Sequence, residues 1–131
     1  MPSFHQAVTK KIDRVSKMLG VSDYSFHIII TKSKKPKNKY DVYGSVIIDE
    51  ETREVVVNIN EGMLKKRPDQ INNTIVHELL HVRFSELCSL INVILSLYVK
   101  DMKAKKAYTR QIEQLEHKII VALSGALTKR K

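Results

Sequence analysis

Two histidines and a glutamate stand close together in the middle of the chain, at His77, Glu78 and His81. The histidines are four residues apart, and on a helix this spacing turns their side chains by only about 40° relative to each other. Both imidazoles can therefore reach one tetrahedral zinc ion. The carboxylate of Glu78 projects beside such a metal, where it can take a proton from zinc-bound water. The pattern predicts a zinc-dependent hydrolase in which Glu78 is the general base.

A catalytic zinc usually has a third protein ligand and an open fourth position. The metzincin pattern, with a third histidine nearby, is excluded because Phe84 and Leu87 stand where it needs glycine and histidine. The remaining candidates are carboxylates from later in the chain. These are Glu113 and Glu116, with Glu86 a weaker candidate.

The apolar face of the last predicted helix separates these carboxylates. Apolar residues at helical spacing predict the face that packs on the core: Ile112, Leu115, Ile119, Leu123 and Ala126. Glu116 falls inside this stripe, Glu113 on its edge, and His117 on the outer face. A carboxylate on a buried face needs a partner, which a metal or one of the many lysines would provide. We expect Glu116 to be the third zinc ligand, ahead of Glu113, with His117 a weaker candidate.

The rest of the sequence predicts one domain over residues 1–131, of the α+β class. Apolar spacing predicts an N-terminal helix over 4–19, which Gly20 ends. Three strands follow and form a small, mainly antiparallel sheet with a turn at 49–52 between the last two: 25–31, 42–49 and 53–60. Helices occupy the remainder, with Pro68 near the start of the histidine helix, a further helical stretch and a last helix: 86–105 and 108–127.

The chain has a net charge of +9 over 131 residues, and lysines cluster in 32–39 and 100–106. Such a charge favours contact with nucleic acid or an acidic protein, although runs of this length are also common on solvated surfaces. The one cysteine, Cys88, cannot form an internal disulfide, and neither a signal peptide nor a membrane helix is predicted. We therefore expect a cytoplasmic protein without membrane contact. The segment 87–99 is apolar on more than one side, and is either deeply buried or part of a dimer interface.

With these residues in place, the chain resembles the gluzincin-type zincins. It is most similar to the compact HExxH zinc metallopeptidases of phages and bacterial mobile elements. The resemblance covers about residues 25–127 and rests on the helix Ile75-Val76-His77-Glu78-Leu79-Leu80-His81 and on Glu116 ahead of an apolar run. It implies a minimal zincin-like domain, zinc as cofactor and a protein or peptide as substrate. It also implies His77, His81 and Glu116 as ligands and Glu78 as base.

Several points stay open at the level of the sequence. The Asn-Ala edge-strand signature of thermolysin-like enzymes is missing, and so is the His-Gly-x-Leu-His pattern of small zinc endoribonucleases. A residue that stabilises an oxyanion cannot be chosen among five candidates: Tyr40, Tyr43, Tyr108, Arg83 and Arg110. The alternative function is a basic nucleic-acid-associated accessory protein whose zinc site is structural or idle. Glu78 argues against it, since a structural site needs no carboxylate there and usually contains cysteine.

Overall fold

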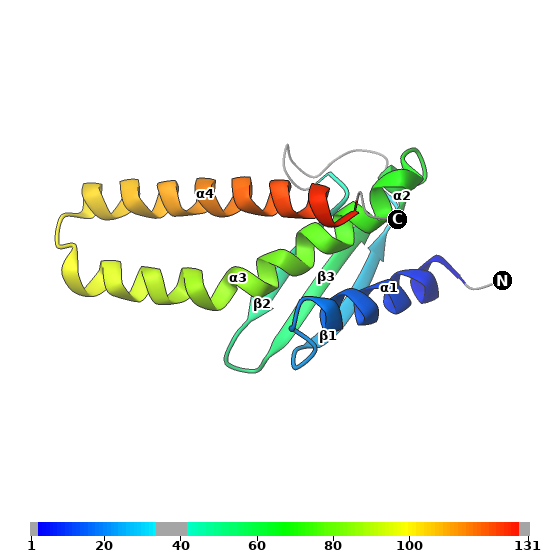
Figure 1. Ribbon diagram of the computed structural model, residues 1–131, viewed down its shortest axis with the longest axis horizontal. Helices are drawn as coiled ribbons and strands as arrows, with labels where there is room; N and C mark the ends of the chain where they lie inside the picture. Colours follow the sequence, from blue (N-terminus) through cyan, green and yellow to red (C-terminus); the bar gives the residue numbers. More distant parts are fainter. Residues whose placement is uncertain (1–2, 34–41, 129–131) are drawn as a thin grey trace.

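The computed structural model describes residues 3–33 and 42–128, and it has an α+β architecture (Figure 1). A three-stranded sheet packs against helices, and two long helices form an antiparallel hairpin that extends well beyond the sheet. The elements follow in chain order: α1 (Phe4–Met18), β1 (Ser25–Thr31), β2 (Gly44–Asp49), β3 (Glu54–Asn60), α2 (Glu61–Leu64), a 3₁₀ turn (Pro68–Gln70), α3 (Ile71–Tyr98) and α4 (Met102–Thr128).

The first helix, α1, follows from local signals. Ser3 and Gln6 form a capping box, in which each side chain accepts a hydrogen bond from the other's backbone N–H. Val8, Ile12 and Val15 are buried at helical spacing. The helix ends before Gly20, whose φ of +72° lies in the left-handed region that glycine adopts without strain. The predicted N-terminal helix is confirmed.

The sheet is mixed rather than mainly antiparallel. Its order is β1-β3-β2, with β3 parallel to β1 and antiparallel to β2. The predicted turn between β2 and β3 is confirmed, and the carboxylate of Asp49 caps it by accepting hydrogen bonds from the N–H groups of Glu51 and Thr52. Because β3 inserts between the other two strands, its inward side chains are the most buried of the sheet, and Val55, Val57 and Ile59 are fully buried.

The C-terminal half differs from the predicted helix boundaries. α3 runs without a break from Ile71 to Tyr98, so the histidine motif and the apolar stretch after it share one helix. The break comes at 99–101, where Val99 is extended and the carboxylate of Asp101 accepts a hydrogen bond from the N–H of Lys103. The last helix therefore starts at Met102, six residues earlier than expected. Apolar periodicity continued across this short connection, and so it did not reveal the break.

The face of α4 that packs on the core is also not the predicted one. Leu115, Ile119 and Leu123 are 58, 47 and 38% exposed, whereas Ile120 and Ser124 are buried. The sequence pattern identified an apolar stripe correctly, but the prediction that this stripe packs on the core is wrong. The side of α4 that faces α3 is therefore the row formed by Glu116, Ile120 and Ser124.

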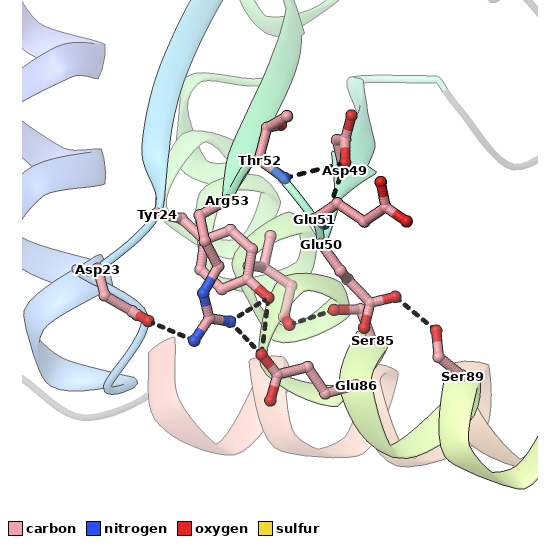
Figure 2. Close-up of polar contacts among 11 residues, drawn as sticks. Asp23, Tyr24, Asp49, Glu50, Glu51, Thr52, Arg53, Ser85, Glu86 and Ser89 are labelled. Carbon is pink, nitrogen blue, oxygen red and sulfur yellow. Dashed lines mark hydrogen bonds and ion pairs between the residues drawn. The ribbon is translucent and has the colours of Figure 1, made fainter.

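A polar cluster joins the sheet to the base of the helical hairpin (Figure 2). Arg53 at the start of β3 pairs with Asp23 at 3.0 Å and with Glu86 of α3. The Tyr24 hydroxyl donates to Glu86 and accepts a hydrogen bond from Arg53, both at 3.1 Å. Beside them, the hydroxyl of Ser89 on α3 donates to the carboxylate of Glu50 in the β2–β3 turn. These contacts hold α3 at a fixed position relative to the edge strand β2.

Candidate metal centre

The two motif histidines lie on one face of α3, as their spacing predicts. The ring centroids of His77 and His81 are 5.1 Å apart, and the ring planes are inclined by 66°. The intervening residues Leu79 and Leu80 are buried in the core, which fixes the orientation of this turn of helix. Glu78 is itself 7% exposed and faces a pocket next to His81. The described structure therefore brings together the three residues with which the sequence argument began.

A third histidine comes from α4. The ring centroid of His117 lies 5.6 Å from that of His77. Each of His77, His81 and His117 offers a nitrogen atom, and among the described residues these nitrogens lie within 4.8 Å of one another. Four-coordinate zinc with Zn–N bonds of 2.0–2.1 Å places its nitrogen ligands about 3.4 Å apart. Small side-chain rotations would close that gap, so the three imidazoles fit a zinc ion.

The expected third ligand, Glu116, lies in the same place but makes different contacts. One carboxylate oxygen is 3.6 Å from Nδ1 of His81. The other accepts a hydrogen bond from the thiol of Cys88, with Sγ at 3.3 Å. Both side chains of the His81–Glu116 pair are shielded, with 26 and 19% of their surface exposed. Glu113 is exposed, and Glu86 is engaged with Arg53.

The sequence pattern placed His117 on the outer face of α4 because the apolar stripe was assigned to the core. With the core side taken as Leu115 and Ile119, His117 pointed outward. With the core side at Ile120 and Ser124, both Glu116 and His117 turn toward α3. The sequence does contain one indication of His117. Glu116 and His117 are adjacent residues of types that commonly ligate metals, and they precede Ile120 where α4 passes the histidine motif.

Cys88 is a neutral neighbour of the site rather than a nucleophile. Burial raises the pKa of its thiol to about 11, with further contributions from the hydrogen bond and negative charge of Glu116. At neutral pH the group is therefore a protonated thiol, which donates to the Glu116 carboxylate.

A pocket of about 460 Å³ opens beside these residues. Ser45, Val46 and Ile48 of β2 form one wall, and Thr109 and Ile112 of α4 form the opposite wall. Between them lie side chains of α3 and the two facing carboxylates of α4: Glu78, His81, Ser85, Cys88, Glu113 and Glu116. Glu78 and one of the histidines are thus reachable from a groove that runs along an edge strand of the sheet.

The five oxyanion candidates separate by position. Tyr40 lies outside the described residues. Arg110 lines a second pocket together with His81, Glu116 and His117. Arg83 lines a different pocket with Arg53, and neither Tyr43 nor Tyr108 lines a pocket with the histidines among those described. Arg110 is therefore the candidate best placed near the histidine cluster.

Comparison with protein-family models, with curated proteins and with solved structures finds no match. The functional reading consequently depends on the residues of this chain alone.

Proposed function

We propose that the chain is a zinc-dependent metallopeptidase. The observation that carries the proposal is the meeting of His77, His81 and His117 from two helices, with the buried carboxylate of Glu78 next to them. A purely structural zinc site has no use for a carboxylate at that position, whereas a hydrolase needs a base there. When bound, zinc would lower the pKa of a water molecule and polarise the substrate carbonyl.

The residues of the chain divide the remaining work between them. Glu78 takes a proton from the attacking water and passes it to the leaving amine. The open groove accepts the substrate beside β2, which among the described strands is paired on one side only. The free edge of such a strand can hydrogen-bond an extended backbone, which favours a peptide as the substrate. Arg110 lines a pocket with His81 and His117, and we propose that it contributes positive charge toward a developing oxyanion.

We infer that His117 completes the ligand set and that Glu116 positions His81. A metal-bound histidine usually binds the metal through one nitrogen while the other contacts a carboxylate or carbonyl. Glu116 lies at Nδ1 of His81, so in this assignment the metal would bind through Nε2. A nitrogen of His117 lies within 4.8 Å of a nitrogen of His77 and of a nitrogen of His81. Glu116 as the third ligand is the competing assignment, and the two make different predictions for zinc affinity.

The proposal is tested by proteolysis of an unfolded substrate such as casein, with zinc-loaded wild-type protein and Glu78→Gln. The variant keeps the shape of the side chain but cannot act as a base, so we expect zinc to be retained and hydrolysis to fall by about 10²-fold or more. Glu51→Gln, in the exposed β2–β3 turn, is the matched control and should keep full activity. Equal activity of wild type and Glu78→Gln would refute the mechanism. Inactive wild-type protein with salt-sensitive DNA binding would favour the accessory function.

A further inference from the structure

One side of the helical hairpin carries large apolar side chains that nothing in the described chain covers. On α3, six of them are between 46 and 77% exposed: Leu87, Leu90, Val93, Ile94, Leu97 and Tyr98. On α4, four are between 38 and 58% exposed: Tyr108, Leu115, Ile119 and Leu123. Each is roughly half exposed, so together they present on the order of 1,000 Å², well above the ~300–600 Å² of the largest patch on a typical monomer. Exposed apolar patches of this size mark sites of contact with another protein or a membrane.

The apolar residues are ordered in a way that matches helix packing. At 100° per residue, the six residues of α3 fall within an arc of about 140°. Four of them, Leu87, Leu90, Ile94 and Leu97, follow the alternating spacing of three and four residues that forms a coiled-coil seam. Since α3 and α4 run antiparallel, their wheels turn in opposite senses, and this places both stripes on the same side of the hairpin. The polar residues of α3 that line the catalytic groove, such as Ser85 and Asn92, lie on the other side.

We propose that this face binds the same face of a second copy of the chain, so that two hairpins form an antiparallel four-helix bundle. The exposed area exceeds the ~800 Å² that each partner buries in a standard interface. Two-fold self-association of one patch is the commonest form of protein assembly. The proposal does not depend on the chemistry proposed at the histidine cluster, although Leu115 and Ile119 flank His117 on α4.

The charges select the antiparallel arrangement of the two hairpins. The tip of each hairpin is basic, with Lys100, Lys103, Lys105 and Lys106. At the base, Asp23 and Glu86 are balanced by Arg53 and Arg83, with which they line one pocket, while Glu50 of the β2–β3 turn lies on the groove side beside Ser89 (Figure 2). A parallel pair would bring the two lysine-rich tips together. The antiparallel pair keeps the two basic tips apart, placing each beside the charge-balanced base of its partner, and brings the two copies of Ile94 close to the two-fold axis.

A lipid bilayer is the less favoured occupant. The region Pro68–Tyr98 is long and apolar enough to cross a membrane by length and composition, with a mean hydropathy of 1.4 and 17% of that window buried. However, the first half of α3 is packed in the core, and the exposed part, 87–98, is only about 17 Å long at 1.5 Å per residue. The hydrocarbon layer is ~30 Å thick. The polar side of this part of α3 also lacks the lysines and arginines of interfacial helices, since it presents Ser89, Asn92 and Ser96.

The first test measures molar mass in solution over a range of concentrations, by light scattering or sedimentation equilibrium. We expect a wild-type dimer of about twice the 15.1 kDa chain mass. Leu90→Glu and Leu97→Glu each place a charge in the interface and should weaken association by about tenfold or more. Met18→Glu alters a side chain of matched exposure on α1, 56% against 57% for Leu90, and should leave the dimer intact. Circular dichroism verifies that every variant is folded.

A second test determines whether the two hairpins pack antiparallel to each other. Ile94→Cys in a Cys88→Ala background should form an intermolecular disulfide under mild oxidation, because antiparallel helices bring the two copies of position 94 together. Val121→Cys, on another side of α4 and 50% exposed, should not. A wild-type chain that remains monomeric up to its solubility limit would overturn the proposal. So would a monomer that binds phosphatidylserine vesicles through Leu90 and Leu97, which would make the face a membrane surface. Both measurements use neither substrate nor zinc, so their failure leaves the peptidase proposal standing.

Discussion

Replacing Ile120 by alanine tests which face of α4 packs on the core, and hence why Glu116 and His117 face α3. Ile120 is fully buried, whereas the adjacent Val121 is 50% exposed. Ile120→Ala removes three carbon atoms, which at about 0.8 kcal/mol for each buried methylene amounts to roughly 2.4 kcal/mol. The cavity left behind adds to this loss, and the better helix propensity of alanine returns about 0.5 kcal/mol. We expect the free energy of unfolding to fall by about 3 kcal/mol.

The assay is urea denaturation of metal-free protein at one fixed concentration, since bound zinc or a change in association would alter the apparent stability. Val121→Ala is the matched control, because it changes a β-branched residue of the same helix on an exposed side. It should alter the free energy of unfolding by no more than about 0.5 kcal/mol. Equal losses for the two variants, or a larger loss for Val121→Ala, would refute the orientation of α4 and with it the position of His117.

Two further predictions concern backbone and thiol chemistry. At Gly44 a Cβ would lie 2.7 Å from the backbone oxygen of Asn58, so Gly44→Ala should lower the melting temperature, whereas Gly125→Ala, with nothing within 4 Å in α4, should raise stability by up to about 1 kcal/mol. An unchanged or higher melting temperature for Gly44→Ala would contradict the packing of β2 on β3. With its pKa raised to about 11, the thiol of Cys88 has roughly 0.03% thiolate at pH 7.5, and alkylation of metal-free protein by iodoacetamide should be slow and accelerate as pH approaches 11. Glu116→Gln removes a negative charge that raises this pKa, so alkylation at pH 7.5 should become faster, and an unchanged rate would refute the Cys88–Glu116 contact.

The parts of the structure that follow from local sequence were predictable. The i, i+4 spacing of His77 and His81 determines their common face once the segment is helical, and Glu78 must then lie beside them. The start of α1 and its end before Gly20 depend on capping and backbone preferences within a few residues. These features need no knowledge of what lies elsewhere in the chain, which is why the structure agrees with them.

The parts that depend on distant contacts were not predictable in the same way. Strand sequences identified β1, β2 and β3 but did not contain the information that β3 inserts beside β1 in parallel. The stripe of Leu115, Ile119 and Leu123 was visible in the sequence, but apolar periodicity does not reveal what covers a stripe. Here the stripe is exposed within one chain, and the row of Glu116, Ile120 and Ser124 faces α3. When an apolar face lies outside the core of the chain, apolar periodicity alone assigns it wrongly to the core.

The central claim is that His77 and His81, together with a residue of α4, hold one zinc ion, and competition titration with a chromogenic chelator tests it most directly. The wild-type chain should bind one zinc tightly, and His81→Ala should abolish tight binding, because the site would then have two ligands. His117→Ala should weaken binding far more than Glu116→Gln, for which a loss of about 10–100-fold is expected if the carboxylate only positions His81. Failure of the wild-type chain to bind zinc would contradict the account, and a greater loss for Glu116→Gln than for His117→Ala would return the third ligand to Glu116.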